Sequence, residues 1–237
     1  MTLSCFAAFI MGLSKAGLKG TGILCVTILA IAQGPKASVG ILLPILIFGD
    51  ILAVFFYNKH VKWKYLLKFL PLMILGVLAG AWIGKHLSEE LFKMIMSIII
   101  LLSTLMMLFW DRYNKKIPNN LAFAGSMGFG AGFTTMIGNM AGAFSNIFFL
   151  ALRIPKNVFI GTSAWLFFII NLVKMPIHIF YWKTIDFQTL WIDLYLLPAA
   201  AIGFFIGLKI VERLSEFDFR KFILIMTALG AVFMLLK

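Results

Sequence analysis

The chain has 237 residues, of which 62% are hydrophobic and 13% are charged, and its mean hydropathy is +1.02. Soluble domains are about half apolar and about one quarter charged, so this composition excludes a soluble enzyme, a disordered chain and a disulfide-stabilised scaffold. A net charge of +12 suggests nucleic acid in a soluble protein. In so apolar a chain it is better explained by lysine and arginine at the ends of membrane helices. We therefore expect a multi-pass protein of the cell (plasma or inner) membrane, with the lipid bilayer and not nucleic acid as its partner.

Eight apolar segments follow one another along the chain, and a bilayer-spanning helix needs roughly 20 residues. They cover about residues 3–32, 37–57, 69–84, 91–110, 121–152, 158–182, 190–211 and 219–236. The first and fifth segments are interrupted, because GLSKAGLKGTG occupies Gly12–Gly22 and GFGAGFTTMIGNMAG occupies Gly128–Gly142. The polar stretch 111–120 is the clearest linker. The pattern predicts an all-α membrane protein with two broken or re-entrant segments.

The two halves of the chain match at offsets of 120 to 127 residues, which predicts an internal repeat. Matching pairs include Phe9/Phe129, Gly12/Gly132, Gly22/Gly142, Pro35/Pro155, Pro71/Pro198, Gly76/Gly203 and Gly80/Gly207. We expect one transmembrane domain over 1–237, with repeat 1 at about 1–110, a linker at 111–120 and repeat 2 at about 121–237. Duplicated membrane domains whose helices break at matching places are typical of carriers.

The distribution of basic residues distinguishes two topologies. If the first and fifth segments cross fully, the repeats are parallel, and lysine and arginine divide evenly between the two faces. If these segments are re-entrant, each half has three crossings and the halves are inverted. One face then gathers the basic stretches 58–68, 111–120, 153–156 and 209–221. The positive-inside rule favours this arrangement, so we predict inverted repeats with both chain ends outside.

Few ionisable side chains lie inside the predicted segments, and such residues are functional candidates by default. Asp50 and Asn171 occupy corresponding positions in the two copies after a one-residue shift, so they could face each other at a midplane site. Lysine attracts anions as a point charge, and helix ends at the breaks add backbone N–H donors. The predicted substrate-binding residues are Lys15, Lys19, Asn139, Thr162, Asn171 and Lys174, and the predicted broken-helix glycines are Gly17, Gly20, Gly22, Gly138 and Gly142.

Several of these residues have a structural alternative. Asp50 could carry a proton, or it could form a structural ion pair with Lys15 or Lys174, and the two interpretations are equally favoured. Lys15 and Lys19 could extend to an interface. The GxxxG pairs of the two halves could allow close helix packing, within one protomer or in a homodimer. Coupling to a proton or another ion stays open.

Motifs of enzymes and metal sites are missing from the sequence. It has no GxxxxGK[ST], HExxH or GxSxG and no Cys/His cluster, so we expect neither an enzyme nor a cofactor or metal. Cys5 and Cys25 lie in apolar stretches and are expected to be packing residues.

Four stretches together resemble the TauE/SafE family of membrane permeases. They are GLSKAGLKGTGILCV (Gly12–Val26), ILLPILIFGDILAVFFY (Ile41–Tyr57), GFTTMIGNMAG (Gly132–Gly142) and FIGTSAWLFFIINLVKMP (Phe159–Pro176). The resemblance implies a secondary transporter for small sulfur-containing anions, such as sulfite or organosulfonates, usually working as an exporter. Many similar members carry His-Ala-Gly-Gly-Pro after the TT-like segment, where this chain has Asn139–Phe144. That departure leaves the substrate and any histidine-based proton coupling open.

The first interpretation is therefore a carrier that binds its anion between the two repeats. An anion channel, or a carrier for another small carboxylate or oxyanion, is the main alternative. A membrane scaffold is a third interpretation, and it predicts that no substrate changes the thermal stability of the protein. A membrane enzyme is remote, because the sequence lacks a catalytic constellation.

Overall fold

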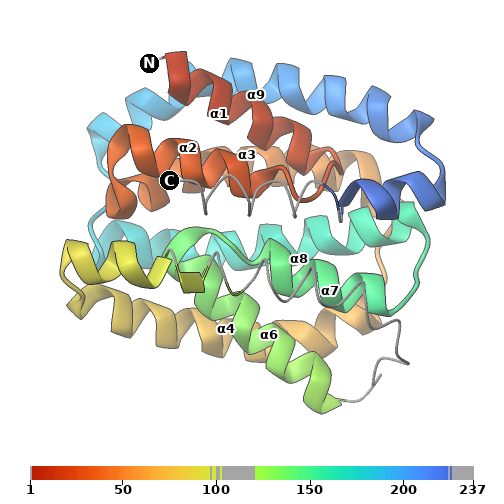
Figure 1. The fold of residues 1–237 in the computed structure, drawn as a ribbon, viewed down its shortest axis with the longest axis horizontal. Helices are drawn as coiled ribbons and strands as arrows, with labels where there is room; N and C mark the ends of the chain where they lie inside the picture. The colour runs from red at the N-terminus through yellow and green to blue at the C-terminus, as the bar shows by residue number, and fades with distance from the viewer. Residues whose placement is uncertain (1, 97, 100–101, 103–120, 224, 226–237) are drawn as a thin grey trace.

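The computed structural model describes residues 2–96, 98–99, 102, 121–223 and 225, and their regular structure is all helical (Figure 1). The long helices are α1 (Thr2–Lys15), α2 (Gly22–Gln33), α3 (Pro35–Tyr57), α4 (Trp63–His86), α6 (Leu121–Gly138), α7 (Gly142–Ala151), α8 (Lys156–Pro176) and α9 (Phe187–Arg213). A 3₁₀ turn, Asn58–His60, follows α3, and a π-helical turn, Ile177–Tyr181, extends α8. Residues 89–96 and 216–223 are also helical. The predicted helical architecture is confirmed over this part of the chain.

Five of these helical stretches are long and apolar enough to cross a bilayer. They are Pro35–His60, Trp63–His86, Leu121–Gly138, Lys156–Tyr181 and Phe187–Arg213. The chain is therefore a multi-pass membrane protein. Most of the fourth and eighth predicted segments, the linker 111–120 and the C-terminal end lie outside the described residues.

Both predicted interruptions are breaks between two helices. α1 ends at Lys15 and α2 begins at Gly22, while α6 ends at Gly138 and α7 begins at Gly142. In each case the second helix turns back and packs against the first. We call α1 and α2 the first hairpin, and α6 and α7 the second. At about 1.5 Å per residue, the 14 residues of α1 and the 10 of α7 are shorter than the hydrocarbon core, which is roughly 30 Å thick.

Residues at both breaks have left-handed backbone conformations. In the first hairpin, Gly17 has φ 127° and Gly20 has φ 98°. Glycine enters this region without a steric penalty because it lacks a Cβ. In the second hairpin, Asn139 has φ 55°, a conformation in which asparagine is enriched over most other residues. The glycines and the asparagine therefore explain why these helices stop where they do.

The first hairpin packs on α9 through backbone contacts that leave no room for a side chain. A Cβ on Gly12 would lie 2.0 Å from the carbonyl oxygen of Ala200. A Cβ on Gly203 would lie 2.1 Å from the carbonyl oxygen of Phe9. α1 and α9 therefore touch backbone to backbone. They run in the same direction, because Gly203 lies against Phe9 and Gly207, one turn later, lies against Leu13.

The second hairpin packs on α4 in the same way. A Cβ on Gly132 would lie 1.9 Å from the carbonyl oxygen of Met73, and one on Gly76 would lie 2.2 Å from that of Phe129. These glycines and those at the α1–α9 contact are the ones that matched in the sequence. Their GxxxG faces pack inside the protomer, which resolves the choice that the sequence left between packing within one chain and packing in a homodimer.

α3 and α8 cross each other antiparallel in the middle of the molecule. Near the end of α3, the carbonyl oxygen of Tyr57 would lie 2.5 Å from a Cβ on Gly161, near the start of α8. Near the start of α3, a Cβ on Gly40 would lie 2.3 Å from the carbonyl oxygen of Thr184, beyond the end of α8. The two helices therefore run in opposite directions.

The bundle has two ends, each marked by one loop. We call the end where α3 begins and α8 connects to α9 the Trp182 end; there the Trp182 indole N–H donates to the carbonyl of Ala81 at 2.9 Å. We call the opposite end, where α3 connects to α4 and α8 begins, the Asn58 end. The tip of the second hairpin approaches the Trp182 end, since Ile137 and Trp182 would both crowd a Cβ on Gly84.

α9 starts with a capping box in the loop of the Trp182 end. The Thr189 amide donates to the Asp186 carboxylate at 2.8 Å, and the Asp186 amide donates to the Thr189 hydroxyl. The hydrogen bond from the Thr189 amide favours the ionised carboxylate and holds the pKa of Asp186 below its usual value. Two of the free amides at the start of a helix are thereby satisfied.

The glycine contacts predict a sharp difference between two alanine substitutions. Gly132→Ala places a methyl group against the Met73 carbonyl, so we expect the helices to separate and the free energy of unfolding to fall by about 1–3 kcal/mol, as for overpacked cores. The matched control is Gly142→Ala, where the nearest atom to an added Cβ is 3.9 Å away. Thermal unfolding of the purified protein in detergent measures both. Equal midpoints for the two variants would contradict this packing.

Candidate functional site

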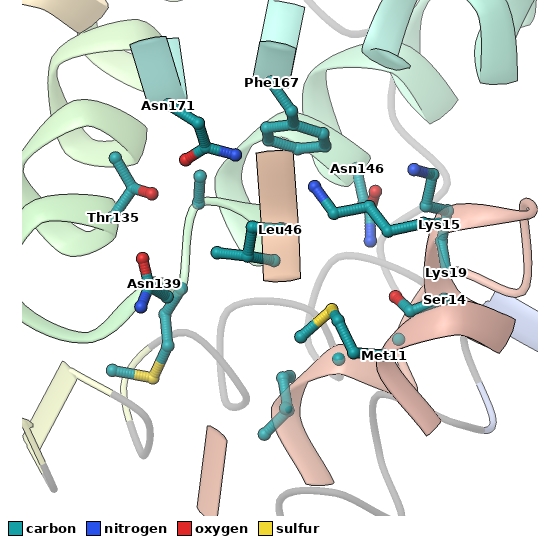
Figure 2. A pocket seen from close by; sticks show the side chains of 16 residues that line it. Met11, Ser14, Lys15, Lys19, Leu46, Thr135, Asn139, Asn146, Phe167 and Asn171 are labelled. Carbon is teal, nitrogen blue, oxygen red and sulfur yellow. The ribbon is translucent and has the colours of Figure 1, made fainter. Parts of the chain in front are cut away.

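A cavity of about 70 Å³ lies between the tips of the two hairpins and the middle of α3 and α8 (Figure 2). Pockets for drug-sized ligands measure roughly 300–1,000 Å³, so this cavity suits a small ion or molecule. Its polar lining comes from both hairpins and from α8, through Ser14, Lys15, Lys19, Thr135, Asn139, Asn146 and Asn171. The cavity therefore lies where the sequence predicts a site between the two halves.

A buried ion pair joins the first hairpin to α3 beside the cavity. Lys15 Nζ lies 2.5 Å from Asp50 Oδ1, and the Asn171 amide of α8 donates to Asp50 Oδ2 at 2.7 Å. Asp50 is fully buried, so both carboxylate oxygens depend on these partners. Of the two ion pairs left open by the sequence, the structure contains the one with Lys15. The predicted meeting of Asp50 and Asn171 is also confirmed.

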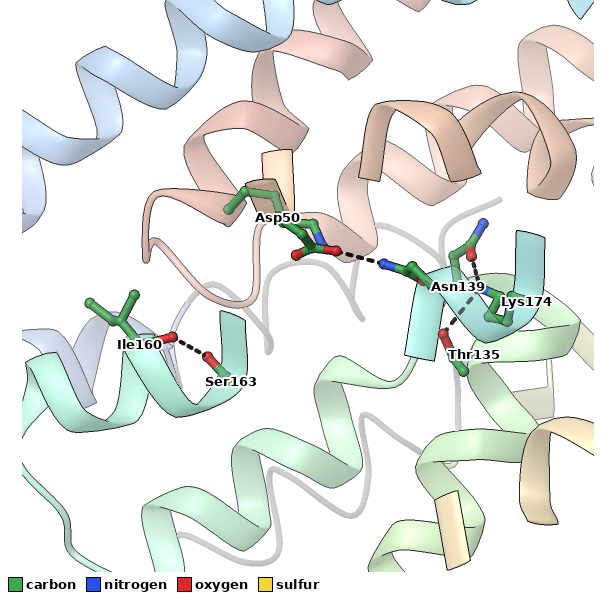
Figure 3. A network of polar contacts seen from close by, with 8 residues as sticks. Asp50, Thr135, Asn139, Ile160, Ser163 and Lys174 are labelled. Carbon is green, nitrogen blue, oxygen red and sulfur yellow. Dashed lines mark hydrogen bonds and ion pairs between the residues drawn. The ribbon is translucent and has the colours of Figure 1, made fainter. Parts of the chain in front are cut away.

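Lys174 makes the corresponding link in the second hairpin (Figure 3). Its ammonium group donates to the Thr135 hydroxyl at 3.3 Å and to the Asn139 side-chain oxygen. The Asn139 amide nitrogen donates in turn to the carbonyl of Val39 in α3 at 3.1 Å. Both ends of the Asn139 side chain are therefore occupied by protein partners.

Lys19 differs from these residues because its ammonium group has no hydrogen bond to the described part of the chain. It lines the cavity, is 5% exposed, and lies 5.3 Å from the centre of the Phe167 ring. Lys15 lies over the same ring at 5.2 Å. An aromatic face attracts a cation but leaves its hydrogen-bond donors unused. Lys19 is therefore free to bind an anion in the cavity.

Neutral polar groups line the cavity on the side of α7. Asn146 lines the cavity wall, and its side-chain oxygen, an acceptor, has no partner in the described residues, while its amide nitrogen is a donor. α7 begins at Gly142 and α2 begins at Gly22, both at the cavity and both without a side-chain cap. The start of a helix carries partial positive charge and free amides. Lys19 and the two helix starts together favour a small anion over a cation.

The structure brings most of the predicted site residues together. Those that line the cavity are Lys15, Lys19, Asn139, Asn171, Gly20, Gly22 and Gly142. Lys174 and Asp50 do not line the cavity themselves. Lys174 is hydrogen-bonded to the lining residue Asn139, and Asp50 is hydrogen-bonded to the lining residue Asn171. Gly17 and Gly138 shape the hairpin tips.

Thr162 lies away from the cavity. Its hydroxyl is fully buried and accepts a hydrogen bond from the Lys62 amide at 3.0 Å, at the Asn58 end. This contact ties α8 to the loop between α3 and α4, and no hydrogen bond joins Thr162 to the lining residues in the described structure.

Three further residues were not selected from the sequence. Phe167 lies one helical turn before Asn171 on the same face of α8, so the spacing 167–171–174 could have indicated it. Ser14 directly precedes Lys15. Asp193 is 3% exposed in α9, and both its carboxylate oxygens lack a partner in the described residues. Asp193 lies near the start of its predicted segment. Charged residues are common at the ends of membrane helices, so the sequence did not indicate that this one is buried.

The family model "Sulfite exporter TauE/SafE" matches residues 4–234 of the chain. The chain belongs to the TauE/SafE family. Comparison with curated proteins finds no match, and comparison with solved structures finds none either. Family membership implies a membrane transporter of sulfur-containing anions, located in the cell membrane, and a transporter family is consistent with a chain that is not an enzyme.

The ion pair of Lys15 and Asp50 predicts strongly non-additive mutant stabilities. Asp50→Leu leaves the buried Lys15 ammonium without a carboxylate, and Lys15→Met leaves the buried Asp50 carboxylate without its cation, so we expect each single change to lower the free energy of unfolding by about 3–5 kcal/mol. Lys15→Met combined with Asp50→Leu removes both charges and should cost much less than the two single changes together. Thermal unfolding of the three variants measures this coupling. A double variant as unstable as the sum of the single ones would argue against the ion pair.

Proposed function

We propose that this protein is a secondary transporter that exports small sulfur-containing anions, such as sulfite or organosulfonates, by alternating access. The anion would bind in the cavity between two inverted repeats, about 1–110 and 121–237, joined by the linker 111–120. The observation that supports the proposal is Lys19, which lies in a small cavity between two helix breaks and whose ammonium group has no hydrogen bond to the residues that the structure describes.

The proposed inversion is supported by the direction of equivalent helices. α3 and α8 are the counterparts of each other in the sequence match, yet they run antiparallel. Parallel repeats would make them run the same way. The glycine contacts also fit an inverted repeat, because each hairpin packs on a helix of the other half. The first hairpin packs on α9 and the second packs on α4. A pseudo-two-fold axis in the membrane plane, as in many carriers, relates such pairs.

The proposed orientation follows from the basic loops. The inverted arrangement gathers Lys59, Lys62 and Lys64 at the Asn58 end together with Arg153 and Lys156. The positive-inside rule then makes the Asn58 end cytoplasmic. Export would load the cavity from the Asn58 end and release the anion at the Trp182 end.

The roles proposed for the site residues follow from their partners. Lys19 and Asn146 would hold the anion, aided by the amides at the starts of α2 and α7. Lys15, Asn171, Asn139 and Lys174 would form the polar frame around it, while Asp50 would neutralise Lys15 and could take part in coupling. Thr162 enters the proposed site through the family motif alone, because its hydroxyl is occupied by Lys62.

The second candidate is an anion channel, or a carrier for another small carboxylate or oxyanion. A carrier is favoured over a channel because a hairpin tip is hydrogen-bonded to α3 on each side of the cavity, through Tyr57 and Ala16 at the Asn58 end and through Asn139 and Val39 toward the Trp182 end. Counterflow distinguishes the two, because a carrier exchanges a labelled outer anion for an unlabelled inner pool and an open pore does not.

The proposal predicts counterflow of a sulfur anion that depends on Lys19. Proteoliposomes preloaded with unlabelled sulfite, taurine or sulfoacetate should accumulate the corresponding labelled anion. Lys19→Met should weaken the apparent affinity about 10- to 100-fold, as expected for a lost charge-assisted hydrogen bond. Lys209→Met makes the same chemical change on an exposed face of α9 and should leave it unaltered.

Two results would count against the proposal. Counterflow that is insensitive to Lys19→Met would remove Lys19 from the anion site. Folded protein without counterflow of any of the three anions would separate the fold from sulfur-anion transport.

A further inference from the structure

The tip of the second hairpin is tied down on two sides by one side chain. Asn139 accepts from Lys174 of α8 and donates to the Val39 carbonyl of α3. Val39 lies near the start of α3, so this bridge stands between the cavity and the Trp182 end. Asn139 has a left-handed backbone conformation, with φ 55°. From this position its short side chain reaches both α3 and α8.

The tip of the first hairpin is held at the opposite end of the bundle by a different contact. The Tyr57 hydroxyl, at the end of α3, donates to the carbonyl of Ala16 at 3.2 Å. Beside it, Gly17 packs closely against Ile160 at the start of α8. This tip therefore stands between the cavity and the Asn58 end.

The two tips differ in what the side chains at their corresponding positions bind. Lys19 and Asn139 correspond at an offset of 120 residues. Asn139 has both polar groups engaged with helices α3 and α8, whereas Lys19 has no hydrogen bond in the described residues and faces the cavity. In an inverted repeat, such a difference between counterparts distinguishes the closed side from the side that can open.

We infer that the two hairpin tips are separate gates, and that Asn139 is the latch that seals the cavity from the Trp182 end in this conformation. Tyr57, through its hydrogen bond to Ala16, holds the gate at the Asn58 end. Opening toward the Trp182 end requires that Asn139 release both Lys174 and Val39, so Asn139 acts on access to the cavity and not on the anion. This inference rests on the proposed alternating access, and it can be tested without any transported anion.

Sided thiol labelling of the cavity tests the latch. The reporter is Ser14→Cys, a cavity-lining position, in a chain whose own cysteines are replaced by Cys5→Ala and Cys25→Ala. A membrane-impermeant maleimide is applied to intact cells and, separately, to inside-out vesicles. Asn139→Gly removes the latch while glycine keeps the left-handed backbone. We expect labelling from the Trp182 end to rise about tenfold or more, and labelling from the Asn58 end to stay within about twofold.

Two matched variants make the result specific. Tyr57→Phe removes only the hydroxyl at the other gate and should raise labelling from the Asn58 end alone. Lys209→Met changes an exposed side chain of α9 outside the cavity lining and should leave both labelling rates unchanged. If Asn139→Gly does not fold, Lys174→Met breaks the same latch from its other side, with the same sided rise expected.

Several outcomes would overturn the inference. Unchanged labelling from the Trp182 end in both Asn139→Gly and Lys174→Met would remove the latch. An equal rise from both ends would mean general loosening of the protein instead of a gate. Sided labelling as expected, together with absent counterflow of sulfur anions, would keep the gate and reject the proposed substrate.

Discussion

A helix that stops inside a bilayer leaves amide and carbonyl groups that lipid cannot satisfy. In this protein α1 ends at Lys15 and α6 ends at Gly138, and residues of both hairpins line a cavity between other helices, so protein surrounds these ends. The surrounding helices are α3 and α8 in the middle and α4 and α9 outside. Backbone-to-backbone contact through Gly12, Gly132, Gly76 and Gly203 brings these helices close enough to exclude lipid. The close packing and the cavity are therefore consequences of the same constraint.

Because the hairpin tips are buried, the charged side chains near them need partners within the protein. Lys15 enters the interior with the first hairpin, and the carboxylate of Asp50 compensates it while Asn171 satisfies the second oxygen. Lys174 is satisfied by neutral oxygens of Thr135 and Asn139. These bonds stabilise the two hairpins against the central helices, whereas the ammonium group of Lys19, which lines the cavity, has no hydrogen bond within the described part of the chain. The proposed anion site depends on this difference between Lys19 and the other two buried lysines.

Several features of the site followed from the sequence because they depend on local chemistry. Glycine-rich stretches predicted the two breaks, and the repeat offset predicted that Asp50 and Asn171 meet. Other features depend on rotamers and on the crossing of helices. The sequence left open whether Lys15 or Lys174 would pair with Asp50, and only the crossing of α1, α3 and α8 distinguishes them. Thr162 matched the family motif, yet its hydroxyl binds the Lys62 amide because α8 starts beside that loop.

The sequence by itself determined that this protein is a helical membrane protein of the TauE/SafE type with two broken segments, because hydropathy, glycine positions and motifs are properties of short stretches. The tertiary structure decided which helices run antiparallel, which lysine keeps a free ammonium group, and that Asn139 bridges two helices. Those properties depend on contacts between residues about 100 positions apart, as between Asn139 and Val39. No local pattern encodes such contacts, since they form only when the two halves pack together.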